Sequence, residues 1–395
     1  MISSHGDLDP LDRVTLKRTS RLNDGHLWIF SNELEGSPKG YTPGALVDVY
    51  DRHDNFVAVG YINPHSLIAI RILSREKEEI DADFLRERII ASVEYRKRFL
   101  PTKDSFRVIY SEGDLLPGLI VDKYNDVIVV QTLTYGMERM QTILLTLLDD
   151  IFKPSAIVLR NDSAIRQLEG LQMEKRLVKG ALDELPVIEE GGLSFEVDPM
   201  SGQKTGFFLD QSENRMAFAR LISGGHGLDL FSYTGAWALH VVKRGAFVTL
   251  VDSSDNAIKR ATKNAQLNNL HHRCEFVKDD VFDFLKRQVQ QGNLYDFIVV
   301  DPPAFVRSRA SLKEGLRGYV ELNSLAVKAL KSGGLLATSS CSYHLTQEMF
   351  MEMITRCCVG RNTRILEVRS QGLDHPRLLA VAETQYLKCA FVQVL

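Results

Sequence analysis

The sequence has little that would suit a membrane, secreted or metal-bound protein. No apolar run among its 395 residues approaches the roughly 18 that a membrane helix needs. The start, MISSHGDLDPLDR, lacks the basic and then apolar order of a signal peptide. Five cysteines are an odd number, and no CxxC pair or Cys/His cluster suggests zinc. We therefore expect reduced thiols, a cytoplasmic location, no membrane contact and no metal.

An excess of charge of one sign is also lacking. The chain has 48 Lys and Arg against 51 Asp and Glu, a formal net charge of −3. This excludes a protein coated in positive charge, but a local basic stripe would be enough to bind nucleic acid. A hydrophobic content of 44% and a charged content of 25% are those of an ordinary globular protein. The length favours roughly two to three domains.

The first 190 residues contain two regions with different patterns of predicted secondary structure. Residues 11–75 hold short strand-like stretches, GALVDVYD, FVAVGYI and LIAIRIL, which predict a small β-rich barrel. Residues 76–190 are predicted to contain both helices and strands. Their apolar spacing predicts a helix over 81–99, capped by Asp81 or Asp83, and hairpins follow it. A compact central α+β domain is therefore expected here.

From residue 195 to 395, strands and helices alternate. The predicted strands are GLDLF, FVTLVD, CEFVKDD, YDFIVVD and GGLLATSS, with a helical stretch after each of the first four. This order predicts an α/β fold with a doubly wound parallel sheet and helices on both faces. Ligands of such sheets bind at the carboxyl ends of the strands, so those ends hold the candidate functional residues.

Acids, but no phosphate-binding loop, follow the predicted strands. Asp229 begins DLFSYTGAW, Asp252 ends the second strand, and Asp279–Asp280 end the third. Because GxGxxG is absent, these acids suit a nucleoside ligand without a pyrophosphate, and S-adenosylmethionine is the candidate. Asp252 alone would more simply be a helix cap. Three acids at successive strand ends favour cofactor binding.

The fourth strand ends in DPPAF. Its two prolines, Pro302 and Pro303, stiffen the backbone and leave no N–H groups to pair. Asp301 can bind a nucleobase by hydrogen bonding, and Phe305 can stack on it. A plain turn is the alternative, but the preceding acids favour base recognition.

Cys341 follows the fifth strand in SSCSY. A thiolate that adds to C6 of cytosine makes C5 able to take up a methyl group, which is covalent catalysis by an activated nucleophile. An ordinary thiol is nearly as good an interpretation for Cys341, although its position at a strand end between small serines favours function. The other cysteines are better interpreted as packing residues: Cys274, Cys357, Cys358 and Cys389.

Several stretches together resemble a known family. SEGDLLPGLIVDKYND, GQKTGFFLDQSENR, LDLFSYTGAWAL, YDFIVVDPPAF, GGLLATSSCS and DHPRLLAVAETQYLK are similar to those of the PUA-domain-containing, S-adenosylmethionine-dependent 23S rRNA cytosine-C5 methyltransferases (RlmI-like), in the same order over nearly the whole chain. The resemblance implies a PUA RNA-binding domain at 11–75, the small α+β domain at 76–190 and a Rossmann-like class I methyltransferase domain at 195–395. It also implies 23S rRNA as the partner, and a homodimer.

The resemblance also implies roles by matching position. Cys341 would be the nucleophile and Asp301 would orient the base, next to Pro302, Pro303 and Phe305. Pro303 stands where other RNA cytosine-C5 enzymes carry a second cysteine, so release by two cysteines is not supported. The residues expected to bind the cofactor are Phe207, Asp210, Asp229, Phe231, Gly235, Asp252 and Asp280.

RNA contacts are predicted from charge. Lys17, Arg18 and Arg21 could bind phosphates and Trp28 could stack on a base, as could basic residues of the helix over 81–99. A solvated basic face is at least as good an interpretation of each residue singly. Two other functions remain open: a methyltransferase acting on a base nitrogen, which needs no cysteine, and a non-catalytic rRNA-binding assembly factor.

Overall fold

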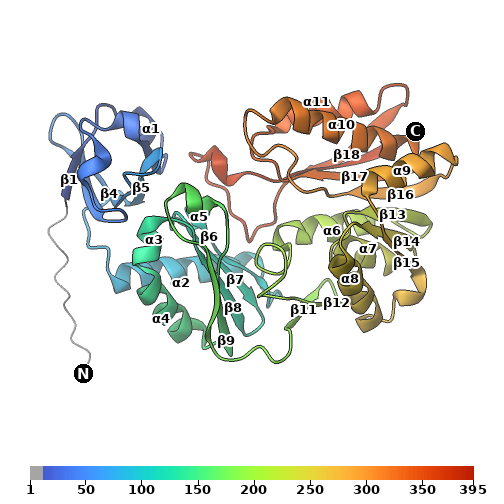
Figure 1. The fold of residues 1–395 in the computed structure, drawn as a ribbon, viewed down its shortest axis with the longest axis horizontal. Helices are drawn as coiled ribbons and strands as arrows, with labels where there is room; N and C mark the ends of the chain where they lie inside the picture. The colour runs from blue at the N-terminus through green and yellow to red at the C-terminus, as the bar shows by residue number, and fades with distance from the viewer. Residues whose placement is uncertain (1–11) are drawn as a thin grey trace. The chain divides into compact units, whose positions relative to one another are not determined.

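The computed structural model describes residues 12–395, and Figure 1 shows their fold. These residues divide into two compact units. The first contains the chain up to Glu184 together with Asp198–Gly206 and Leu373–Thr384. The second contains Leu185–Val197, Phe207–Gly372 and Gln385–Leu395.

The first unit holds two five-stranded sheets. The N-terminal sheet has the order β1-β3-β4-β5-β2 and the other has the order β10-β9-β8-β7-β6. The strands are β1 Asp12–Thr15, β2 Trp28–Phe30, β3 Leu46–Tyr50, β4 Phe56–Ile62, β5 Ile68–Ser74, β6 Phe106–Tyr110, β7 Leu119–Tyr124, β8 Val127–Thr132, β9 Ala156–Asn161 and β10 Glu174–Lys179. The helices are α1 Ser20–Asn23, α2 Ala82–Phe99, α3 Tyr135–Arg139, α4 Gln141–Phe152 and α5 Ile165–Leu168.

The long helix α2 begins where the sequence predicts. The Asp81 carboxylate accepts a hydrogen bond from the backbone N–H of Phe84 at 2.9 Å and so caps the helix. Arg96 does not belong to an exposed basic stripe, because it is fully buried and pairs with Asp114. Its guanidinium also donates to the backbone oxygen of Asp374 at 2.7 Å, which fastens the late segment Leu373–Thr384 into this unit.

The second unit is built on a seven-stranded sheet of order β15-β14-β13-β16-β17-β19-β18. Neighbours from β15 to β17 are parallel, whereas β19 is antiparallel to both β17 and β18. The strands are β13 His226–Leu230, β14 Phe247–Asp252, β15 Cys274–Lys278, β16 Tyr295–Val300, β17 Leu330–Ser340, β18 Thr363–Arg369 and β19 Lys388–Val394, and the separate hairpin is β11 Val187–Glu190 with β12 Leu193–Glu196. The predicted fold class is confirmed, with an antiparallel edge that the sequence analysis did not include.

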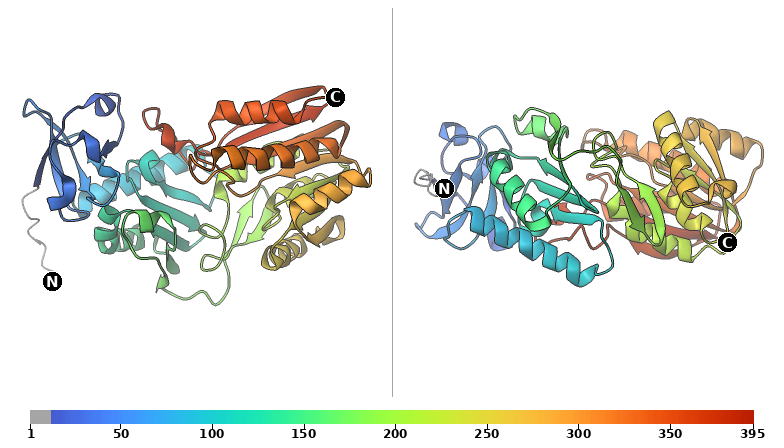
Figure 2. Two further views of the ribbon diagram at one scale, coloured as in Figure 1. Left: turned by 45° about the horizontal axis from the view of Figure 1, so that its top comes forward. Right: turned by 90° about the horizontal axis from the view of Figure 1, so that it is seen from below.

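Helices cover both faces of this sheet, as the views in Figures 1 and 2 show. They are α6 Ser212–Arg220, α7 Ala236–Val242, α8 Asp255–Leu267, α9 Val281–Gln290, α10 Leu312–Lys328 and α11 Gln347–Cys357. Alternate residues of each strand face opposite layers, so Ile298 and Val300 pack towards α9–α11 while Phe297 and Val299 pack towards α6–α8.

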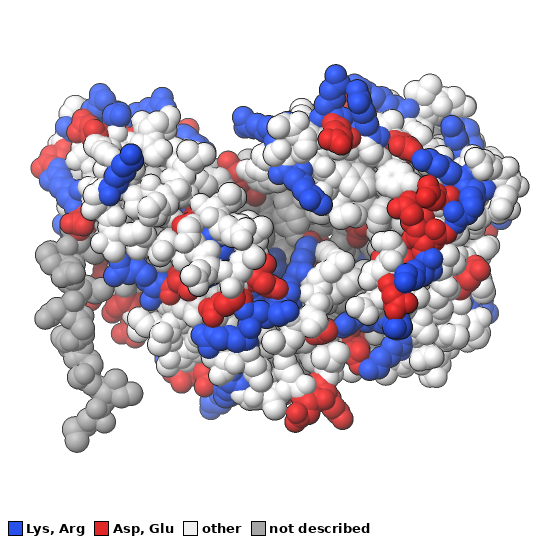
Figure 3. Space-filling model, viewed as in Figure 1, with Lys and Arg blue, Asp and Glu red and all other residues white. Residues whose placement is uncertain are grey.

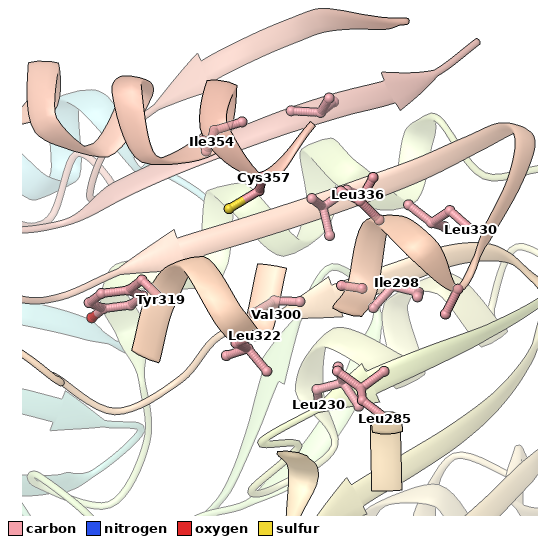
Figure 4. Close-up of a cluster of buried hydrophobic side chains, with 14 of the residues drawn as sticks. Leu230, Leu285, Ile298, Val300, Tyr319, Leu322, Leu330, Leu336, Ile354 and Cys357 are labelled. Atoms are coloured by element: carbon pink, nitrogen blue, oxygen red, sulfur yellow. The ribbon is translucent and has the colours of Figure 1, made fainter. Parts of the chain in front are cut away.

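Figure 4 shows the α9–α11 side of this core, where Leu322 of α10 and Ile354 of α11 pack in one cluster with Leu336 of β17. The Cys357 thiol lies among these aliphatic side chains, and burial raises its pKa to about 11. Cys358 and Cys389 are also buried. Packing is therefore the role of these three thiols, as predicted.

Basic and acidic side chains are interspersed on the face shown in Figure 3, in keeping with the small net charge. Within residues 12–395, none of the helices combines the length and apolar character needed to cross a membrane.

Candidate active site at the ends of the parallel strands

The turn that follows β13 has an unusual backbone. Phe231 (φ 62°), Tyr233 (φ 46°) and Gly235 (φ 75°) all lie in the left-handed region. Each such residue other than glycine costs on the order of 1–3 kcal/mol, and this strain is typical of functional sites. The backbone N–H of Tyr233 donates to an oxygen of Asp252 at 3.0 Å, so the end of β14 holds the turn in place.

Gly235 is required by space as well as by conformation. A Cβ atom there would lie 3.0 Å from a methyl group of Leu250 and 3.2 Å from the Cβ of Ala261. Any side chain would push the start of α7 away from β14 and α8. Glycine at residue 235 therefore allows both the left-handed backbone and the close packing of the start of α7 against β14 and α8.

Asp229 lies beneath this turn and is 1% exposed. Its Oδ2 atom accepts the backbone N–H of Ala238 at 2.9 Å, whereas its Oδ1 atom is buried and has no hydrogen-bond partner among residues 12–395. Burial is the main reason that the pKa of Asp229 rises to about 8, and nearby Asp301 and Asp252 add to it. A buried acceptor without a donor fits the cationic amino group of a ligand such as S-adenosylmethionine.

The other two acids differ from each other. Asp252 binds the turn and the N–H of Ser254, and the cap of α8 is Ser254, so the simple capping interpretation of Asp252 fails. Asp280 does cap its helix, since it accepts the N–H of Asp283 at 3.1 Å. That both also bind the cofactor stays a prediction.

Both carboxylate oxygens of Asp301 are held by side chains that the sequence analysis did not identify. Oδ1 accepts from Gln211 Nε2 and Oδ2 from the indole N–H of Trp237, each at 3.0 Å. Both partners are buried. The carboxylate at the end of β16 is therefore fixed in direction, which suits the predicted role of orienting a base.

The DPPAF segment leaves the sheet beside Asp301. Pro302 is buried and Pro303 is exposed. The Phe305 ring is partly buried and packs against Tyr319 of α10, with 4.7 Å between ring centroids. Stacking of Phe305 on a base stays a prediction.

Cys341 directly follows β17 and is half-buried, unlike the buried thiols of Cys357, Cys358 and Cys389. The hydroxyl groups of Ser340 and Ser342 on either side both bind the Tyr319 hydroxyl, at 2.8 and 2.9 Å. Lys388, the first residue of β19, pairs with Ser340 across the sheet. The sequence analysis missed Lys388, because an antiparallel strand at this position gives no local signal.

Phe207 and Asp210 precede α6. Phe207 is buried against Phe195 of β12 and beneath the Arg215 guanidinium, which lies 4.8 Å from its ring centre. The Asp210 carboxylate accepts a hydrogen bond from the Tyr386 hydroxyl. These contacts fix the segment, and its predicted place beside the cofactor stays a prediction.

The predicted RNA-binding residues lie in the first unit and differ in exposure. Lys17 and Arg18 are exposed, whereas Arg21 and Trp28 are half-buried. The indole N–H of Trp28 donates to Glu112 at 2.8 Å, so this ring is held within its own unit. RNA contacts by all four stay predictions.

The second unit combines a doubly wound sheet, a strained glycine turn after β13 with Asp229 beneath it, and the fixed acid Asp301 at the end of the adjacent strand β16. These features define a class I, S-adenosylmethionine-dependent methyltransferase. A family model for S-adenosylmethionine-dependent methyltransferases matches residues 159–359, and one for PUA-like domains matches residues 13–75. The chain belongs to this methyltransferase family, and its relatives include proteins named ribosomal RNA large subunit methyltransferase I.

Two such relatives cover nearly the whole chain. The protein from Cronobacter sakazakii is 35% identical over 92% of this chain and 94% of its own length. The protein from Aeromonas hydrophila is 37% identical over the same shares. The crystal structure of SMU.776 complexed with SAH shares the fold, with a TM-score of 0.85 over 97% of this chain and 99% of that one, at 21% identity.

Proposed function

We propose that this enzyme methylates C5 of a cytosine in large-subunit ribosomal RNA, with Cys341 as the covalent nucleophile. The relatives supply the substrate class through their names. The observation that carries the chemistry is the position of Cys341, a half-buried thiol that directly follows the strand next to β16, whose end bears Asp301.

The chain's own residues account for binding and orientation. The ammonium of S-adenosylmethionine fits the Oδ1 acceptor of Asp229, which lies beneath the turn that contains Gly235. Gln211 and Trp237 hold Asp301 so that its carboxylate can bind the amino edge of a cytosine. When bound, S-adenosylmethionine supplies an electrophilic methyl group.

Cys341 is needed because C5 of cytosine is a poor nucleophile. Addition of the thiolate to C6 forms an S–C6 bond and shifts the ring electrons towards C5, which becomes enamine-like and can accept the methyl group. Loss of the C5 proton to a base then returns electrons to the ring, breaks the S–C6 bond and releases the thiolate. A nitrogen-directed enzyme would need none of these steps.

Phosphate contacts are available close to this site. The segment after DPPAF carries four exposed cations, Arg307, Arg309, Lys313 and Arg317, none of which forms an ion pair within residues 12–395. Lys313 belongs to the first turn of α10, where the helix dipole disfavours positive charge. Cations kept at such a place favour an anionic partner, and the RNA backbone is one.

Substitution of Cys341 by Ala tests the proposal. The variant should retain binding of S-adenosylmethionine by calorimetry but lose formation of 5-methylcytidine in rRNA by at least about 1000-fold, as measured by nucleoside mass spectrometry. Cys274→Ala is the matched control, since that half-buried thiol begins β15 and should not affect turnover.

RNA containing 5-fluorocytidine adds a second readout. Fluorine cannot leave C5 as a cation, so the wild-type enzyme should be trapped as a covalent protein–RNA complex and Cys341→Ala should not. Undiminished methylation by Cys341→Ala would exclude the covalent route and favour a base nitrogen as the methyl acceptor.

A further inference from the structure

Lys388 is a buried lysine with no acidic partner. It is 3% exposed, and no carboxylate of residues 12–395 forms an ion pair with it. Lysine is almost never fully buried unless it is paired, because removing an ammonium from water without a counter-charge costs several kcal/mol. Packing of the sheet alone therefore does not account for a charged side chain at residue 388.

The contacts of the ammonium lead to the backbone around Cys341. Nζ donates to the backbone oxygen of Ser342 at 2.6 Å and to that of Tyr386 at 2.7 Å. An ammonium has three N–H donors, so one donor has no partner among residues 12–395. Lys388 also pairs with Ser340 across β17 and β19. Its side chain thus reaches past Cys341 to the next residue.

Few titratable groups surround this ammonium. The negative charge of a Cys341 thiolate attracts the Lys388 ammonium and raises the pKa of the lysine. From α10, the Tyr319 hydroxyl faces the same segment through Ser340 and Ser342, and burial raises its pKa, so it stays neutral. The Tyr386 hydroxyl instead points to Asp210. Among residues 12–395, the Cys341 sulfur is therefore the anion-forming group whose charge acts on Lys388.

We propose that Lys388 is a positioning residue whose ammonium is the counter-charge of the Cys341 thiolate, so that it favours ionisation of the nucleophile before attack on C6. This inference rests on the proposed function, because it assigns a helper to the same thiol. No proton passes between the two groups in this role: the thiol proton leaves to solvent, and Lys388 keeps all of its own.

Two opposing effects set the pH range of this pair. Burial lowers the pKa of Lys388 to about 8, while the charge of the Cys341 thiolate opposes that shift. Below about pH 8 the lysine carries its charge and supports the thiolate. As the pH rises through about 8, the ammonium loses its proton and its support of the thiolate disappears.

The test is the pH profile of alkylation of Cys341 by iodoacetamide, followed by peptide mass spectrometry in wild type, Lys388→Met and Lys388→Arg. Lys388→Met should shift the midpoint upward by about one pH unit or more, whereas Lys388→Arg, which keeps the charge, should stay close to wild type. The thiols of Cys357 and Cys389 serve as internal references, because burial keeps their pKa values near 11 and 12.

Turnover gives the second readout. With Lys388→Met, kcat at pH 7 should fall about 10- to 100-fold with little change in the KM for RNA, and higher pH should restore part of the loss. Binding of S-adenosylmethionine by each variant shows that the second unit is folded, and Lys388→Gln replaces Lys388→Met if the latter does not fold.

The alkylation profile also separates this inference from the proposed function, because it requires neither RNA nor methyl transfer. A profile of Lys388→Met that coincides with wild type would overturn the role of Lys388 even if Cys341 proves essential. A clear shift combined with undiminished methylation by Cys341→Ala would instead overturn the proposed function and leave only the charge pair between Lys388 and Cys341.

Discussion

Asp229 and Lys388 are both buried and ionisable, and each lacks one expected interaction. Within the part of the chain that the structure describes, Asp229 has a carboxylate oxygen without a hydrogen-bond donor, and the Lys388 ammonium has no ion pair with an acid. In both, burial is the main cause of the pKa shift, upward for the acid and downward for the lysine. Burial thus moves each group towards its neutral form, and a cation bound near Asp229 would favour release of the proton that this acid holds.

The stability of the ligand-free enzyme should depend on pH through Asp229. Its pKa in the folded chain is about 8, above the ordinary value of 3.8, so the folded state holds a proton that the unfolded state releases. The contribution of Asp229 to the unfolding free energy is therefore greatest below about pH 4. It falls by at most about 1.4 kcal/mol per pH unit up to about pH 8. Asn at this position keeps the bond from Ala238 and cannot ionise.

Chemical unfolding of wild type and Asp229→Asn between pH 5 and pH 8.5 measures this difference. The stability of wild type relative to the variant should fall steadily as the pH rises. A difference that is constant over the range would mean that Asp229 is ionised throughout.

Single residues also show the limit of prediction from sequence. Asp301 could be identified because it ends an apolar strand in a distinctive DPPAF segment. Its partner Trp237 is 64 residues away and Gln211 is 90 residues away, so nothing local in the sequence connects them with the acid. Such pairs depend on which strands become neighbours in the sheet, and that is decided by the whole fold.

Among the elements, the hairpin β11–β12 depends on one buried cluster. Glu190 of β11 accepts two hydrogen bonds from Arg215 of α6, both at 2.7 Å, and lies 2.9 Å from His240 of α7. Burial opposes ionisation of Glu190, but Arg215 and His240 outweigh burial and hold its pKa well below the usual range. The cluster ties the hairpin to the two helices that follow it.

Replacement of Arg215 by Met should cost about 3–5 kcal/mol of unfolding free energy, because it leaves the buried Glu190 carboxylate without its main partner. Addition of Glu190→Gln should recover part of that loss, since the double variant no longer buries an unpaired charge. Urea unfolding measures both. Lys259→Met, which breaks an exposed pair with Asp255, is the control and should cost less than about 1 kcal/mol.

The elements up to β17 could be predicted because each carries its own periodic pattern and alternates with a helix. The edge formed by β18 and β19 could not. Two of the apolar residues of β18, Ile365 and Val368, are about half exposed, so the strand lacks a clear buried face. Its pairing partner is separated from it by the segment Leu373–Thr384, which belongs to the other unit.

On the scale of the whole molecule, the last residues of the chain serve both units. Leu373–Thr384 completes the first unit, where the Asp374 carboxylate accepts the backbone N–H of Arg107 at 3.1 Å. Strand β19 then lies inside the sheet of the second unit, between β17 and β18. The C-terminal region is therefore structural in both units.

Two truncations should separate these contributions. Removal of residues 385–395 should increase hydrogen exchange in β13 and β16 and leave β7 and β8 protected, because only the second unit loses a strand. Removal of residues 373–395 should increase exchange in all four strands. Unchanged protection of β7 and β8 in the longer truncation would show that the first unit does not need its late segment.

The interleaved course of the chain has a consequence for biosynthesis. The first unit is largely made by Glu184, but its last piece is translated only when Thr384 emerges, 200 residues later. At about 5–20 residues per second, the nascent N-terminal part waits roughly 10–40 s for completion. During that interval the guanidinium of Arg96 lacks its acceptor on Asp374, so the first unit cannot complete its native contacts until nearly the whole chain has been synthesised.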